Sequence, residues 1–218
     1  MRFRIDLKIF IFLVLFYFTK QIEIYALIMI FAIIHELGHL VAGILMGMKP
    51  EKIELMPFGL SVSFKININE YNKKIKKGNN LETKKILIAL AGPLTNLIMI
   101  LITYRLKIDI IKSMLIIYTN FLIMIFNLLP IYPLDGGRIL KGILHISFGK
   151  RKSEKYINNI SKITVIIITA ITSILILYIQ NISFILIDIY LWYLIIKEDL
   201  IYKKREDIYK KILENNII

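Results

Sequence analysis

The chain has 218 residues, of which 57% are hydrophobic, and it contains no cysteine. This composition excludes an ordinary soluble domain, a disulfide scaffold, a thiolate nucleophile and a Cys-type zinc site, so any metal must be held by His, Asp or Glu. The formal net charge is +13, but the basic residues lie between apolar runs rather than in one patch. We therefore expect no nucleic-acid partner.

Six apolar runs along the chain predict six transmembrane helices. Their ranges are 7–19, 24–46, 86–104, 114–129, 163–179 and 184–196. We expect an all-α polytopic membrane protein embedded in a lipid bilayer, with about six spanning helices. Residues 1–200 would form the membrane domain and residues 201–218 a short cytoplasmic tail. The charged segment after the last run has the pattern of a short amphipathic helix outside the membrane.

The second run holds three ionisable side chains, His35, Glu36 and His39. An ionisable group at bilayer depth is costly unless it is paired or bound to a metal, so such residues indicate a functional site. His35 and His39 lie one turn apart on the same face of a helix, the spacing at which two imidazoles reach one ion. The alternative, polar packing between helices, accounts poorly for three such residues in five positions.

The loop between the second and third runs contains a strand pattern. Residues 60–68 alternate strictly between apolar and polar side chains after a Pro57-Phe58-Gly59 turn, which predicts a β-strand in a small sheet or hairpin. Two roles stay open for it. The hairpin either closes the loop structurally or offers its open edge to an extended substrate peptide.

Proline and glycine predict two irregular segments. Gly92-Pro93 interrupts the third run, so we expect that helix to be bent and packed inside the bundle. The segment 127–138, NLLPIYPLDGGR, contains two prolines and two glycines and is predicted to break the fourth helix. Non-helical backbone near membrane depth is tolerated where it is buried in protein or lines a wet cavity.

Asp135, in this second segment, is the favoured candidate for a third metal ligand. It is the only acidic residue between Asp109 and Glu154, and its glycine neighbours would let the backbone approach an ion closely. Taken alone, an Asp-Gly pair is more often an ordinary turn. The other candidate is His145, which we expect to be an interfacial loop residue because no other ligand type stands at a suitable spacing.

The positive charges predict the orientation of the bundle. Of the 29 Lys and Arg residues, only Lys20, Arg105, Lys107 and Lys112 fall in the loops on one side, and the remaining 25 fall on the other side. Because cytoplasmic loops are enriched in basic residues, both termini and the strand-bearing loop are predicted to be cytoplasmic. The helix of His35 then runs inward, with its polar residues in the cytoplasmic half of the bilayer.

Three segments together resemble the site-2 protease family of intramembrane zinc metalloproteases, peptidase M50. They are residues 35–39 (HELGH), 91–94 (AGPL) and the segment from Asn127 to Gly137. By this resemblance the Zn²⁺ ligands would be His35, His39 and Asp135, and Glu36 would be the catalytic acid/base. The positions that resemble those shaping the site or contacting substrate are Asn127, Pro130 and Pro133.

The residue types support the same roles chemically. Two imidazoles and a carboxylate leave zinc an open position for a water whose pKa falls to roughly 7. Glu36 would take the proton of that water and pass it to the leaving amine, and Asn127 could bind the substrate backbone. We therefore expect hydrolysis of a peptide bond in a membrane-associated protein.

Within the family, the short first run, the early HExxH helix and residues 55–59 (LMPFG) resemble the branch of stage IV sporulation protein FB. Members release a mother-cell sigma factor from its membrane-associated pro-form and are held in check by membrane partner proteins. The resemblance implies a pro-sigma substrate, membrane inhibitor proteins, and a place in the bacterial cytoplasmic membrane or the mother-cell membrane around the forespore. With a tail this short we expect no CBS domain, which members often carry.

Other functions stay open at this point. A site-2 protease could act on another membrane substrate, such as an anti-sigma factor or a signal-peptide remnant. A catalytically silent scaffold or inhibitor on the same fold, or a metal transporter with the same ligands, belongs to a different functional class. A two-His, one-carboxylate site with an adjacent Glu suits hydrolysis better than ion release.

Overall fold

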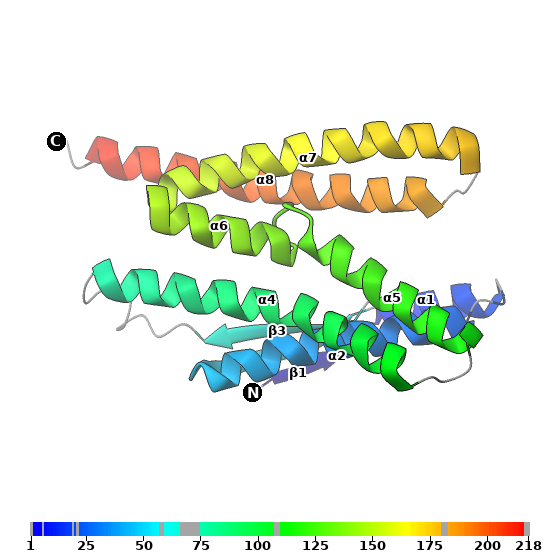
Figure 1. Cartoon of the computed structure of the whole chain (residues 1–218). Helices are drawn as coiled ribbons and strands as arrows, with labels where there is room; N and C mark the ends of the chain where they lie inside the picture. The colour runs from blue at the N-terminus through cyan, green and yellow to red at the C-terminus, as the bar shows by residue number, and fades with distance from the viewer. Residues whose placement is uncertain are drawn as a thin grey trace. The chain divides into compact units, whose positions relative to one another are not determined.

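In a computed structural model of the chain, the residues described are 2–5, 7–18, 20, 22–56, 59–65, 75–106, 110–179 and 183–215. They form helices and one small sheet (Figure 1). The expected helical architecture with a small β-element is confirmed. The chain divides into two compact units, Met1–Leu128 and Leu129–Ile218, and each is described by itself.

The helices described in the first unit are α1 (Lys8–Phe18), α2 (Ile22–Leu45), α4 (Ile75–Leu106) and α5 (Ile110–Leu128). Helices α2, α4 and α5 pack against one another and form the core of this unit. Pro93 lies inside α4, so the helix continues through the Gly-Pro pair. Because proline cannot donate an amide hydrogen, α4 lacks one backbone hydrogen bond at this position.

A three-stranded sheet accompanies these helices, in the order β1-β2-β3. Strand β2 (Lys49–Met56) pairs in parallel with β1 (Arg2–Ile5) and antiparallel with β3 (Gly59–Lys65). Strand β3 agrees with the predicted strand as far as residue 65. The rest of that prediction, residues 66–68, and the turn residues Pro57 and Phe58 lie outside the described residues.

Two strands were not expected from the sequence. Strand β1 has only 4 residues, too few for a period of two to be recognised. Strand β2 begins beside Pro50, where the register with β3 is irregular between Pro50 and Lys52. A proline is accommodated at such a bulge because the ladder is already interrupted there.

The second unit consists of α6 (Asp135–Phe148), α7 (Lys150–Ile179) and α8 (Ser183–Asn215) (Figure 1). The segment between the fourth and fifth apolar runs, for which no helix was predicted, is occupied by α6 and the first turns of α7. The tail was expected to form a separate helix, whereas α8 runs through it without a break. Charged residues such as Lys, Arg and Glu are good helix formers, so a polar stretch can extend an apolar helix.

All six predicted apolar runs lie within helices, apart from residues at their ends. Among the described residues, three helices are long and apolar enough to span a membrane by length and composition, Ile22–Leu45, Asn79–Leu106 and Lys150–Tyr178, and Lys112–Leu128 is a shorter apolar helix. Large apolar side chains are exposed along these helices, as expected for surfaces that face lipid tails.

Polar contacts join α7 to α8. In the apolar stretch, Thr172 is hydrogen bonded to Asp188, and the indole N–H of Trp192 donates to Thr169 at 3.0 Å. Nearer the charged ends, the carboxylate of Asp199 accepts hydrogen bonds from Asn158 at 2.9 Å and from Lys162 at 2.5 Å. The two helices are therefore connected by hydrogen bonds as well as by apolar packing.

Candidate metal centre

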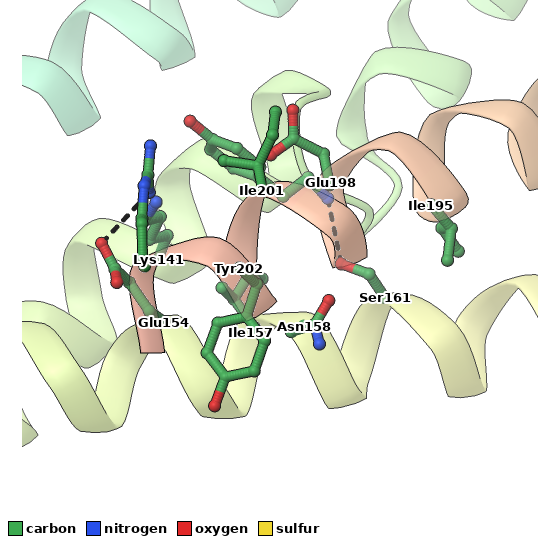
Figure 2. A pocket seen from close by; sticks show the side chains of 11 residues that line it. Lys141, Glu154, Ile157, Asn158, Ser161, Ile195, Glu198, Ile201 and Tyr202 are labelled. Carbon is green, nitrogen blue, oxygen red and sulfur yellow. Dashed lines mark hydrogen bonds and ion pairs between the residues drawn. The ribbon is translucent and has the colours of Figure 1, made fainter. Parts of the chain in front are cut away.

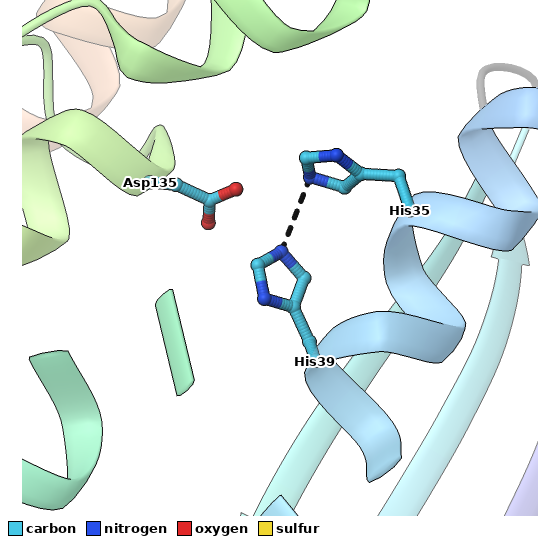
Figure 3. Close-up of side chains that lie close together, drawn as sticks. All are labelled: His35, His39 and Asp135. Carbon is cyan, nitrogen blue, oxygen red and sulfur yellow. Dashed lines mark hydrogen bonds between the residues drawn. The ribbon is translucent and has the colours of Figure 1, made fainter. Parts of the chain in front are cut away.

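The candidate metal centre begins with two histidines on α2. His35 and His39 are 2% and 4% exposed, and their Nε2 atoms are 3.2 Å apart (Figure 3). They lie one helical turn apart, so both rings project from the same face of α2. The sequence spacing therefore predicted their proximity correctly.

Each imidazole ring is oriented by a hydrogen bond at its Nδ1 atom, on the side away from Nε2. The Nδ1 atom of His35 lies 3.1 Å from Oδ1 of Asn96, and Nδ1 of His39 lies 2.7 Å from the backbone oxygen of Ile88. A carbonyl oxygen can only accept, so both Nδ1 atoms carry the hydrogen. The amide N–H of Gly92 also lies 3.3 Å from Nδ1 of His39, but the shorter contact to Ile88 decides the tautomer.

These tautomers leave a lone pair on both Nε2 atoms. Two acceptor nitrogens 3.2 Å apart repel each other unless a cation or a proton lies between them. Imidazole Nε2 is a preferred zinc ligand, and a partner on Nδ1 is the usual way in which such a ligand is fixed. The histidine pair therefore fits a zinc ion.

Asn96 connects the histidine pair to a third helix. It lies on α4 and is 0% exposed, and its Nδ2 donates to the backbone oxygen of Asn120 on α5 at 3.2 Å. That bond fixes the amide so that its oxygen faces His35. Sequence reasoning gave Asn96 no role, although a lone amide within an apolar run was a signal.

Gly92 lets α4 approach the imidazole rings. A Cβ atom at this position would lie 2.4 Å from Nε2 of His39 and 2.6 Å from Nε2 of His35. Even an alanine would therefore occupy the space beside the two Nε2 atoms. The Gly-Pro segment of the sequence thus lines the histidine pair.

Glu36, the predicted acid/base, follows His35 on α2 and is half-buried. Successive helical residues point about 100° apart, since a turn takes 3.6 residues. Its side chain therefore leaves α2 in a different direction from the two imidazole rings.

Asp135 belongs to the second unit, where it is 3% exposed. It was expected in broken backbone, but it is the first residue of α6. The break occupies residues 129–134 only. A carboxylate in the first turn is favoured by the positive end of a helix, and the guanidinium of Arg138 lies 3.5 Å from Oδ1.

The other predicted site residues flank this break. Asn127 lies in the last turn of α5, and its Nδ2 donates to the backbone oxygen of Ile123 at 3.0 Å. Pro130 and Pro133 are half-buried within the break. His145 was expected in a loop, but it lies in the last turn of α6.

Comparison with known proteins gives consistent matches. The family model of peptidase family M50 matches residues 23–112 and 106–171. A zinc metalloprotease of Methanocaldococcus jannaschii is 34% identical over 146 residues, which are 64% of this chain and 39% of that protein. Stage IV sporulation protein FB of Bacillus subtilis is 28% identical over 126 residues, 56% of this chain and 40% of that protein.

The chain thus spans about 40% of the length of these two curated relatives. Among solved structures, the site-2 protease from Methanocaldococcus jannaschii is similar with a TM-score of 0.62 and 26% sequence identity. That similarity covers 91% of each chain. The fold is therefore that of a site-2 protease.

Proposed function

The chain belongs to peptidase family M50, as its sequence resemblance predicted, and we propose that it is an intramembrane zinc metalloprotease. It would hydrolyse a peptide bond of a membrane-associated protein in or near the bilayer. The observation that carries this proposal is the buried histidine pair, because two Nε2 lone pairs 3.2 Å apart call for a cation. The similarity to a zinc metalloprotease and to a site-2 protease supports it.

We assign the zinc to His35, His39 and Asp135. Within the part of the chain that the structure describes, these three buried residues are the group of His, Asp and Glu side chains that could hold a metal ion (Figure 3). Two imidazoles, one carboxylate and an open position are a ligand set typical of catalytic zinc. When bound, the ion supplies Lewis-acid polarisation and an activated water at neutral pH.

Glu36 is the residue proposed to move protons. Its carboxylate would take a proton from the attacking water and deliver it to the nitrogen of the leaving amine. Asn127 would bind the substrate backbone, and Pro130 and Pro133 would shape the site beside it. The bilayer limits the access of water, which strengthens each of these polar interactions.

A helical substrate must unwind before its peptide bond can be cut, and β3 is proposed to hold it in extended form. Among the described strands, β3 is at the edge of the sheet, with β2 on its other side. Main-chain pairing to such an edge is a common way to bind peptides. Val62→Pro would remove a backbone donor, and unchanged cleavage by a folded Val62→Pro variant would rule this role out.

The similarity to a sporulation protein supports a narrower proposal about the substrate. A pro-sigma factor of a sporulating bacterium would be cleaved, with membrane proteins as inhibitors. The protein would then lie in the mother-cell membrane around the forespore, with both termini in the cytoplasm. An anti-sigma factor or a signal-peptide remnant is the competing substrate.

Glu36→Gln tests the proposed activity. The variant should bind as much zinc as the wild type, since no ligand is changed, while cleavage of a co-expressed pro-sigma factor should be lost. Zinc content of the purified protein and the size of the sigma factor on a gel are the two measurements. A transporter or scaffold would keep its function in this variant, so retained cleavage or an absence of zinc in both proteins contradicts the proposal.

A further inference from the structure

The break between α5 and α6 leads directly to Asp135, so whatever holds the break also positions this carboxylate. Pro130 and Pro133 have no N–H to donate. The N–H of Ile131 donates to the backbone oxygen of Leu129 at 2.7 Å, and the N–H of Leu134 donates to the backbone oxygen of Ile131 at 2.8 Å. These two bonds close tight turns within the break itself.

The N–H of Tyr132 is bonded differently. It donates to the side-chain oxygen of Ser161 on α7 at 3.0 Å (Figure 2). Ser161 is 4% exposed and lies 29 positions further along the chain. An N–H removed from water is costly without a partner, so this hydroxyl fixes the path of the backbone three residues before Asp135.

Two further contacts hold the same stretch of backbone. A Cβ atom at Gly137 would lie 2.4 Å from the backbone nitrogen of Tyr132, so α6 itself packs closely against the break. The ammonium of Lys141 lies 4.2 Å from the centre of the Tyr132 ring, within the range of a cation–π interaction. The peptide and the ring of Tyr132 are thus held from α7 and α6 respectively.

Helix α7 is braced at this level by α8. Asn158 and Lys162, on either side of Ser161 along α7, both donate to Asp199. Tyr132, Ser161 and residues of α8 line a cavity of about 30 Å³ (Figure 2), which has room for water but not for a larger ligand. Ser161 is therefore part of a rigid, hydrogen-bonded face and not of a loose surface.

We propose that Ser161 is a positioning residue for the zinc ligand Asp135. Its hydroxyl holds Tyr132 and, through the short break, sets where α6 begins and how Asp135 is presented. This inference rests on the proposed function, because it assumes that Asp135 binds zinc. It gives α7 a part in metal binding, although none of the three assigned ligands lies on that helix.

The test compares Ser161→Ala with Ser161→Thr, which keeps a hydroxyl, and with Ser153→Ala. Ser153 is a matched control because it is also buried on α7, but its hydroxyl donates to Lys150 within the same helix. Each change is made in the full-length Glu36→Gln protein in detergent, and the zinc dissociation constant is measured by chelator competition. Folding is checked by thermal melting, and Ser161→Cys is a second variant of similar size with a weak acceptor.

We expect Ser161→Ala and Ser161→Cys to weaken zinc binding about tenfold, the lower end of the loss caused by removing a group bonded directly to a ligand, because Ser161 acts through the backbone of Tyr132. Ser161→Thr should restore most of the affinity, and Ser153→Ala should match the parent. In the protein that keeps the native Glu36, and so its proposed activity, Ser161→Ala should lower kcat more than it changes KM. If folded Ser161→Ala and Ser161→Cys bind zinc within twofold of the parent, the inference is wrong while the proposed function stands. If the parent binds no zinc, the proposed function itself fails.

Discussion

The two histidines and Asp135 are held in contrasting ways. Each imidazole is oriented by one direct hydrogen bond within the first unit, which its Nδ1–H donates to the side-chain oxygen of Asn96 or to the backbone oxygen of Ile88 on α4. Asp135, in the second unit, stands at a helix start whose approach is fixed through the backbone of Tyr132 and the hydroxyl of Ser161. The comparison separates support that acts on the ligand itself from support that acts on the chain leading to it.

The largest effect should come from removing the carboxylate of Asp135, the third proposed ligand, altogether. We expect Asp135→Ala to lower zinc affinity by more than about 100-fold, beyond what outer-shell changes cause, and to abolish cleavage. Chelator competition and cleavage of a co-expressed substrate measure the two effects. Arg138→Ala is the matched control, because it removes only the guanidinium 3.5 Å from the carboxylate. A metal-loaded Asp135→Ala protein with normal activity would contradict the ligand assignment.

Removing the direct support of a histidine should have the next largest effect. Asn96→Ala takes away the acceptor for Nδ1–H of His35 and leaves that ring free to turn, so zinc affinity should fall about 10- to 100-fold. Asn96→Asp keeps an acceptor at the same place and should lose less. Isothermal titration with zinc in the Glu36→Gln background distinguishes the two variants. Equal losses in both would show that packing, and not the hydrogen bond, is what His35 needs.

The smallest effect should come from the contacts furthest from the ligands. Burial alone would raise the pKa of Asp199, but hydrogen bonds from Asn158, Lys162 and Lys203 lower that pKa well below its usual range. Because the folded-state pKa is depressed, this stabilisation is present above pH about 4, the unfolded value, and is lost as the pH falls below it.

Asp199→Asn should therefore lower the free energy of unfolding by about 1–2 kcal/mol at neutral pH and by less under acid conditions. Zinc affinity should change little. Thermal melting at a series of pH values measures the first effect. A loss of stability that is the same at pH 3 and pH 7 would show that the charge of Asp199 is not responsible.

The sequence was enough to predict the candidate metal ligands, but not the side chains that hold them in place. The spacing of His35 and His39 predicts a shared helix face because the helical period is fixed. The contacts of Asn96 and Ser161 join residues 61 and 29 positions away, and no local pattern specifies such pairs. In the sequence, Asn96 and Ser161 stand out only as isolated polar residues in apolar or mixed segments, which does not reveal their contacts.

The start of α6 shows a second limit. Two glycines after Asp135 are poor helix formers, so the segment resembles a turn. The structure nevertheless begins a helix at Asp135. A Cβ atom at Gly137 would lie 2.4 Å from the backbone nitrogen of Tyr132, so glycine is needed there for close packing against the break and does not mark a turn. The prediction of irregular backbone through residue 138 was wrong for this reason.

The antiparallel pairing of β3 with β2 also has a directional consequence. If a substrate joins the outer edge of β3 in the more common antiparallel manner, its chain runs in the same direction as β2. The sheet would then select the N-to-C polarity of an incoming peptide before any side chain is recognised. A bound peptide would consequently lie along β3 in only one N-to-C direction.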